Sequence, residues 1–271
     1  MSKKRKIVSI TVFVSLIVLL ILGIIFIPGS GGHASIQEVM QNEVLHETHK
    51  ISLFGIMDVN PGLISAFTVS AILIVFALIV RIFVIPKFTI IPGKFQMLLE
   101  EAVGLFDKLA KSNSPHKNKF IGAYIFVAGA YIFVSTVFEL LGLQAVNTLG
   151  HSQTLPAPLA DINGAIAMGL LSYGIILGGG IVSNGFRGAG HALKDFSLPI
   201  SMSFRIFGAM LSGALVTELV YHYLALSFVL PVIVGVLFTL IHAVVQAYVL
   251  TMLTALFYGE CTEPHNKKEK K

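Results

Sequence analysis

The sequence predicts an all-α polytopic membrane protein with five or six transmembrane helices. Hydrophobic residues make up 55% of the 271 positions and charged residues only 12%, which leaves too few charges for a water-exposed surface. Six apolar runs are long enough to cross a hydrocarbon core of roughly 30 Å as helices. A membrane-spanning barrel would need alternating apolar and polar residues, and this alternation is absent. The six runs cover residues 7–27, 64–85, 120–143, 164–183, 198–229 and 231–258.

The first run has two possible fates. It follows four basic residues, as in a signal peptide, but it is long for one, and the segment SGGHAS is only loosely a small-residue cleavage region. Residues 1–30 are therefore expected to be either a cleaved signal peptide or a signal anchor, which leaves five or six spans. Residues 31–63 then form a segment on the outer side.

The positions of lysine and arginine predict the orientation of the chain. Seventeen of the nineteen basic residues lie on or next to one side: before the first run, around the loop after the second, after the fourth, or after the last. Lys50 lies on the opposite side, and Arg205 lies inside a run. By the positive-inside rule both termini are cytoplasmic. Residues 261–271 then form a charged cytoplasmic tail.

The segment PGKFQMLLEEAVGLFDKLAK, residues 92–111, has a different pattern from the six runs. Its apolar residues recur at roughly helical spacing beside acidic and basic ones. This pattern predicts an amphipathic helix that either lies at the inner membrane interface or packs on a partner subunit.

Arg205 lies inside the fifth apolar run and is not counted with the basic residues of either side. An arginine at the centre of a span costs about 2.5–3.5 kcal/mol on insertion scales, so such residues usually face a bundle interior or a watery cavity. Arg205 either reaches the inner interface or forms a structural ion pair, or it faces a neighbour that uses its charge. Small residues follow it, and small residues let another helix approach closely. They are Gly208, Ala209, Ser212, Gly213 and Ala214.

Two motifs resemble those of a known family. SFRIFGAMLSGALV (203–216) is similar to the arginine-bearing pattern of subunit a of the F-type ATP synthase, and IHAVVQAYVLTMLTALFY (241–258) is similar to its last helix. IPGKFQMLLEE, FELLGL and PLADINGAIAM give weaker support, and the matches run in family order from about residue 60 to residue 260. The resemblance therefore implies a transmembrane ion-channel domain over residues 64–260.

The resemblance also implies a function and partners. The chain would be a proton-conducting stator subunit with two half-channels, and its last two helices would form a long hairpin against a rotor ring of c subunits. Peripheral-stalk b subunits and membrane lipid would be further partners, in a bacterial plasma (inner) membrane. The chain would not be an enzyme on its own, and no cofactor, metal or nucleic-acid partner is expected.

The resemblance assigns residue roles as well. Arg205 matches the essential stator arginine and Gln246 the glutamine of the neighbouring helix. The surface that packs against the rotor would be Gly208, Ala209, Ser212 and Gly213. Polar residues within and beside the spans are candidates for the two ion paths: Glu139, Glu218 and His242 toward the outer side, and His191 toward the inner mouth.

The sequence departs from the family pattern at several of these positions. Ala209 replaces the usual asparagine, and Ala214 stands where many members have a titratable group. Glu218 lies one turn beyond Ala214, and His242 lies three residues after Thr239, where the family often has histidine or glutamate. Because the two helices are expected to be antiparallel, these shifts move the two groups in opposite directions. Glu218 and His242 are therefore predicted to be two stations on one water path.

Two other classes of function fit the sequence less well. A secondary transporter could use Arg205 to bind an anionic substrate, but no inverted repeat is evident. A non-conducting scaffold would leave the polar residues of the spans unexplained. Two further motifs receive ordinary interpretations: GFRGAGHALKDF (185–196) is expected to be a flexible inner loop, and His46 with His49 a solvated outer segment.

Overall fold

The computed structural model describes residues 15, 18, 51–53, 57–146, 148, 150, 152–222 and 230–264. It is mostly helical, and four of its helices are long and apolar enough to cross a membrane: Pro61–Lys87, Asn118–Leu141, Ile162–Asn184 and Gly235–Thr262. Almost all of the first predicted run, the pair His46 and His49, and most of the C-terminal tail lie outside the described residues. The number of spans therefore stays a prediction.

The described residues belong to two compact units. The larger one contains His49–Met210 and Leu240–Lys271, and the smaller one contains Met1–Thr48 and Leu211–Thr239. Helices α8 (Ser197–His222) and α9 (Leu230–Thr262) each have residues in both units. Because residues 223–229 are not described, the predicted long hairpin of the last two helices also stays a prediction.

Helix α3 (Pro61–Ile79) begins at a regular N-terminal cap. The side chain of Asn60 accepts a hydrogen bond from the amide of Gly62 at 3.0 Å, and Pro61 occupies the first turn, where its missing N–H costs nothing. A π-helical segment, η1 (Val80–Val84), and a 3-10 turn, η2 (Ile85–Lys87), continue the helix. The span ends near Pro86, whose ring is compatible with the start of a short turn but not with a helix interior.

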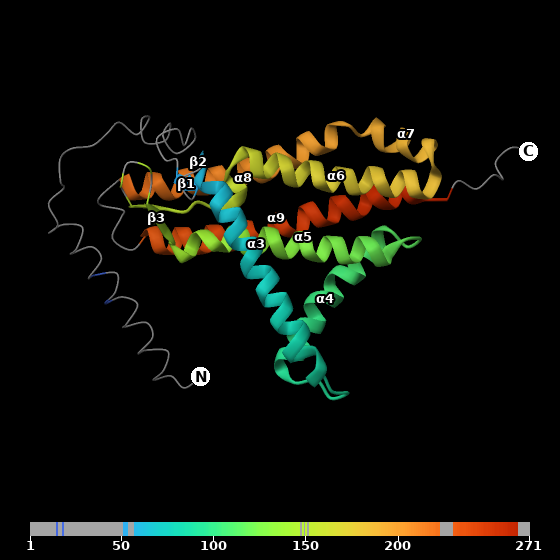
Figure 1. Cartoon of the computed structure of the whole chain (residues 1–271), viewed down its shortest axis with the longest axis horizontal. Helices are drawn as coiled ribbons and strands as arrows, with labels where there is room; N and C mark the ends of the chain where they lie inside the picture. The colour runs from blue at the N-terminus through green and yellow to red at the C-terminus, as the bar shows by residue number, and fades with distance from the viewer. Residues whose placement is uncertain are drawn as a thin grey trace, which may run out of the picture. The chain divides into compact units, whose positions relative to one another are not determined.

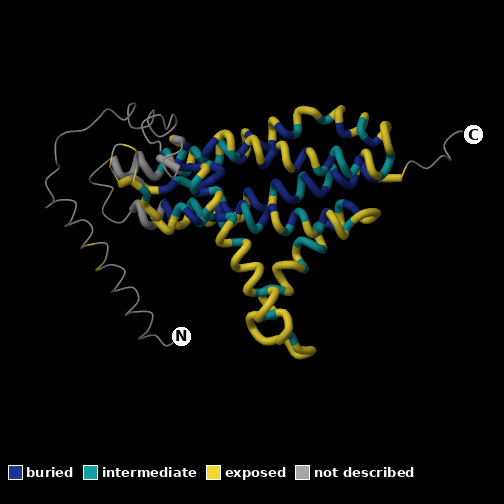
Figure 2. Tube along the Cα trace, viewed as in Figure 1, coloured by how far each residue is buried: buried dark blue, intermediate teal, exposed yellow. Residues whose placement is uncertain are grey.

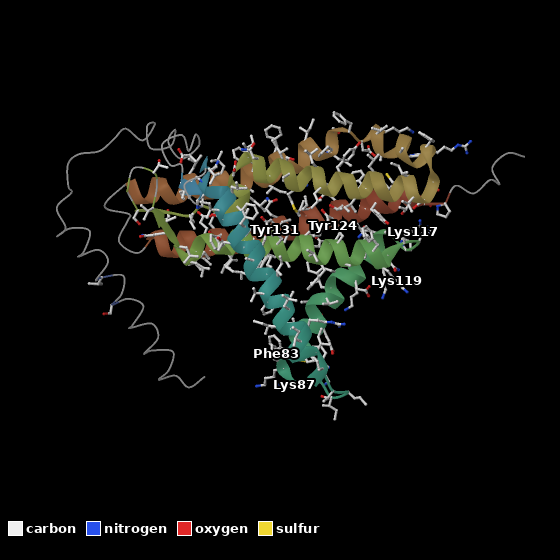
Figure 3. The ribbon with its side chains drawn as sticks, viewed as in Figure 1. Phe83, Lys87, Lys117, Lys119, Tyr124 and Tyr131 are labelled. Atoms are coloured by element: carbon white, nitrogen blue, oxygen red, sulfur yellow. The ribbon has the colours of Figure 1, made fainter. Side chains whose placement is uncertain are left out.

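The predicted amphipathic helix is present as α4 (Lys94–Asn113). Figure 1 shows α3 and α4 as two arms that extend away from the other helices of the larger unit, and most of their residues are exposed (Figure 2). Phe83 and Lys87 lie toward the far end of the α3 arm (Figure 3). Lys117 and Lys119 lie at the start of the next helix, α5 (Asn118–Phe138). The packed part of the larger unit is therefore formed by the later helices.

Two short hairpins correct the expectation of a purely helical chain. β1 (Ile51–Leu53) pairs antiparallel with β2 (Met57–Val59), and β3 (Gln144–Val146) pairs with β4 (Ser152–Thr154). Three residues per strand are too few for a recognisable alternation in the sequence. The helical class still holds for the bulk of the described chain.

Helices α5 (Asn118–Phe138) and α6 (Ile162–Asn184) form the centre of the larger unit. The Tyr124 hydroxyl of α5 and the Ser172 hydroxyl of α6 are hydrogen-bonded at 2.8 Å, and Figure 3 shows Tyr124 and Tyr131 along α5. Two short 3-10 turns lie between these helices: η3 (Glu139–Leu141) follows α5, and η4 (Pro158–Ala160) precedes α6. Asp161 caps α6 by accepting a hydrogen bond from the amide of Asn163 at 3.1 Å.

The expected flexible loop at 185–196 is wrong, because most of it is a helix, α7 (Phe186–Lys194). Gly185, with φ of 60°, makes the turn out of α6. Helix α7 then packs back on α6: the Tyr173 hydroxyl donates to the carbonyl of Ala192 at 3.1 Å, and Gly180 and Gly188 are in close backbone contact. The glycines that suggested a loop instead permit this approach.

The C-terminal end of α9 is attached to the end of α6. The amide of Asn184 donates to the carbonyls of Cys261 at 3.0 Å and Glu263 at 2.9 Å. These carbonyls belong to the last turn of α9 and the residues after it, which have no partners within the helix. Tyr258 also packs on Gly179, where a Cβ atom would meet its ring.

Candidate functional site

Helix α8 has a buried face and an exposed face within the larger unit. Met202, Ile206 and Met210 recur every four residues and are 1%, 0% and 3% exposed. They join a core cluster with residues of α5, α6 and α9. Ser201, Phe204, Arg205 and Gly208 lie on the exposed side of the same helix. The helical period therefore separates the arginine from the residues that hold α8 in place.

Contacts with two neighbouring helices fix the buried face. The Thr136 hydroxyl of α5 donates to the Met210 sulfur at 3.6 Å. Ser203 is 5% exposed and donates to the Pro199 carbonyl at 2.6 Å, and this pair packs against Gly169 of α6. Arg205 follows Ser203 by two positions and lies on the opposite side, because successive residues are about 100° apart around a helix.

The four positions predicted to face a rotor differ in exposure. Gly208 is exposed, and a Cβ atom placed there would have nothing within 4 Å. Ser212 is also exposed. Ala209 is half-buried and packs on the core cluster, and a Cβ atom at Gly213 would lie 3.5 Å from the Phe238 ring of α9. Within the larger unit, Gly208 is therefore the position of this set that has open space beside it.

Gln246 lies in α9 and is only 7% exposed. Its side-chain oxygen is buried and has no hydrogen-bond partner among the described residues. A buried amide oxygen without a partner is costly, by about 1–3 kcal/mol. Such an oxygen is expected to accept a hydrogen bond from water or from a polar group outside the described residues. His242 lies one turn before it and is half-buried.

The remaining predicted residues lie on separate elements. Glu139 begins η3, directly after α5, and is half-buried, whereas His191 is exposed on α7. α5 and α6 run antiparallel (Figure 1). Glu139 directly follows α5, whereas His191 lies on α7, which packs back along α6 with the Ala192 carbonyl at Tyr173. The side chain of Glu218 lies outside the described residues, so its relation to His242 stays a prediction.

The sequence did not single out Gly169, Asn184 or the Tyr124–Ser172 pair. Each acts through a neighbouring helix that is distant in the chain. Gly169 shares its helix with Gly174 and Gly178, which contact nothing within 4 Å of a Cβ position. No local sequence pattern distinguishes Gly169 from Gly174 and Gly178.

Among the described residues, no group of three or more histidine, cysteine, aspartate or glutamate side chains could hold a metal ion.

Comparison with known proteins identifies the family. Residues 63–259 match the family described as ATP synthase A chain. The chain belongs to this family. The match runs from α3 to the end of α9 and includes every predicted site residue.

Relatives of the ATP synthase A chain family agree with this assignment. A protein from Haemophilus ducreyi named ATP synthase subunit a is 26% identical over 201 residues, which cover 62% of this chain and 76% of the relative. Proteins of the same name from Actinobacillus pleuropneumoniae serotype 3 and Histophilus somni are 25% and 26% identical, each with the same coverage. The resemblance found in the sequence is confirmed, and with it a membrane role in ATP synthesis and proton transport.

Proposed function

We propose that this chain forms the stator side of a proton path in an F-type ATP synthase, with the exposed face of α8 turned toward a ring of c subunits. Each c subunit would bring a carboxylate past Arg205. Two half-channels, one from each side of the membrane, would exchange protons with these carboxylates. The chain would have no catalytic site of its own.

The observation that carries this proposal is the exposure of Arg205 on a firmly packed helix. The other face of α8 packs through Met202, Ile206 and Met210, so the arginine does not turn inward to an ion pair within the larger unit. Beside it, Gly208 offers open space to a neighbour. A charge that lipid would disfavour is thereby placed on a surface that another helix can approach closely.

The chemistry follows from the effect of Arg205 on a passing carboxylate. Lipid favours the protonated, neutral form of a carboxylic acid, whereas a nearby guanidinium favours the ionised form. A carboxylate that reaches Arg205 would therefore release its proton, and one that moves away into lipid must first bind a proton. Arg205 would also prevent protons from passing directly between the half-channels. A proton that crosses a potential of 100 mV yields about 2.3 kcal/mol, which would drive rotation.

The polar residues support a location for each half-channel. Glu139 follows the end of α5, whereas His191 lies on α7, which follows the other end of the pair and packs back along α6. These separate positions support one path on the outer side and another on the inner side. Glu218 and His242 would be stations on the outer path. The buried oxygen of Gln246, which lacks a partner among the described residues, would contact the water or the rotor group beside Arg205.

The surroundings of the chain follow from the same proposal. Lipid and the peripheral-stalk b subunits would cover the arms α3 and α4, many of whose apolar side chains are exposed among the described residues. The membrane would be a bacterial plasma membrane with the C-terminus of the chain on the cytoplasmic side. A transporter of anionic substrates is not favoured by any feature of the described residues.

Replacement of Arg205 by alanine tests the proposal. ATP-driven proton pumping is measured in membrane vesicles, and assembly of the complex is checked by purification. We expect an assembled complex whose pumping falls to background, because no fixed cation then discharges the rotor carboxylates. Arg81→Ala is the matched control, because Arg81 is also an exposed arginine in an apolar helix but lies in η1 on the α3 arm. Normal pumping by Arg205→Ala would refute the proposed function.

A further inference from the structure

Helices α6 and α8 approach each other closely at Gly169. A Cβ atom at this position would clash with the Ser203 hydroxyl, lie 2.8 Å from the Pro199 carbonyl oxygen and lie 3.3 Å from the Ser203 amide nitrogen. Two of these three atoms belong to the backbone of α8. They cannot move aside as the end of a flexible side chain could, so a methyl group here would displace the helix itself.

The contact lies directly beside the functional part of α8. Pro199 and Ser203 are buried, and their mutual hydrogen bond of 2.6 Å keeps the serine hydroxyl in the space next to Gly169. Arg205 lies two positions further along the same helix and is exposed on its other side. The depth to which α8 settles against α6 therefore sets how far the guanidinium extends from the protein.

We propose that Gly169 is a positioning residue for Arg205. The missing side chain of Gly169 lets α8 settle on α6 through Pro199 and Ser203, and this contact fixes the distance between Arg205 and the carboxylates that pass it. The inference rests on the proposed function, because it assigns a role to the distance between Arg205 and the rotor. Electrostatic effects between charges decrease with distance, so a small outward or sideways displacement of α8 alters proton release without removing any charged group.

The chain contains a matched control for this idea in the same helix. Gly174 lies five positions after Gly169 in α6, and a Cβ atom there would have nothing within 4 Å. Alanine at either position has the same effect on helix propensity. Only the Cβ atom added at position 169 would clash with α8.

The experiment compares Gly169→Ala with Gly174→Ala in the purified, reconstituted complex. The quantity measured is the ratio of ATP-driven proton pumping to ATP hydrolysis per assembled complex. We expect Gly169→Ala to reduce this ratio at least fivefold and Gly174→Ala to leave it within twofold of wild type. A ratio for Gly169→Ala equal to that of Gly174→Ala would overturn the proposal, even if less complex is recovered, because the glycine would then serve packing alone.

A double variant provides a specific readout of positioning. Ser203→Ala removes the atom closest to a Cβ at position 169, so Gly169→Ala/Ser203→Ala is expected to raise the ratio at least twofold above Gly169→Ala. If Gly169→Ala does not assemble, the double variant takes its place and is compared with Ser203→Ala. Failure of both to assemble would make Gly169 a residue required for assembly and would overturn the proposal.

Arg205→Ala, measured in the same series, separates this inference from the proposed function. If Arg205→Ala pumps normally, the proposed function fails. If Arg205→Ala does not pump and Gly169→Ala behaves as wild type, only the positioning role fails.

Discussion

The buried and exposed faces of helix α8 differ in what they contact. Met202, Ile206 and Met210 pack on other helices of the same chain, whereas Arg205 and Gly208 have an open surface before them. A substitution on the first face should change how stably the chain is assembled. A substitution on the second should leave the chain intact and change what happens at its surface. The two faces of one helix can thus be separated by experiment.

Gly208→Leu should give the largest effect beyond that of Arg205 itself. The position has open space within the chain, and leucine favours helices over glycine, so the helix should fold at least as well. If a rotor passes here, the new side chain obstructs it, and we expect pumping per assembled complex to fall more than tenfold.

Gly208→Ala, which adds only a methyl group, should fall between wild type and Gly208→Leu. Proton pumping in vesicles measures both variants. Full pumping by Gly208→Leu would show that no partner approaches this face and would remove the distinction between the two faces.

Ile206→Ala should produce an intermediate effect of the opposite kind. Ile206 is fully buried, so its truncation leaves a cavity. We expect the free energy of unfolding to fall by about 2 kcal/mol. This is near the low end for buried isoleucines, because the alternative solvent in a membrane is lipid rather than water. The melting temperature of the purified complex should fall, while pumping per assembled complex should stay near wild type.

Ile200→Ala is the control for this truncation, because Ile200 lies on the same helix but is 51% exposed. Its stability should change by less than about 0.5 kcal/mol. Equal destabilisation by the two variants would mean that α8 is held on both faces.

Tyr124→Phe should have the smallest effect. It removes the hydrogen bond between Tyr124 and Ser172, and hydrogen bonds between membrane helices contribute about 0.6 kcal/mol on average. Thermal unfolding should reveal a slight loss of stability without a change in pumping. Tyr131→Phe, a half-buried tyrosine of the same helix, should be neutral. A loss of pumping with Tyr124→Phe would place this hydroxyl on an ion path and extend the functional surface into the packed core.

The sequence predicted those features that depend on local pattern. Apolar runs of sufficient length marked α3, α5, α6 and α9, and the amphipathic repeat marked α4. Of the predicted rotor-facing surface, Arg205 and Gly208 are exposed, whereas Ala209 packs on the core cluster, and its role stays a prediction. These predictions rest on helical periodicity and on the cost of a charge in lipid, both of which are properties of one segment.

The features that escaped prediction depend on contacts between distant segments. Closely spaced glycines predict a loop at 185–196, whereas the structure has helix α7, whose Gly188 lies against Gly180 of α6. The strands are too short to show a period. Gly169 cannot be told from Gly174 until α8 is placed against one of them. In each case the deciding neighbour lies elsewhere in the chain.

The hydrogen bonds from Asn184 to the end of α9 have a mechanical consequence for a stator. A ring that turns past a helix drags it sideways, and a helix with a free end would swing with that drag. The Asn184 side chain, together with the packing of Tyr258 on Gly179, holds the end of α9 against α6. Under the proposed function, a torque that the ring exerts on α9 would be transmitted through these contacts to the α5–α6 pair, and α9 would bend elastically rather than be displaced.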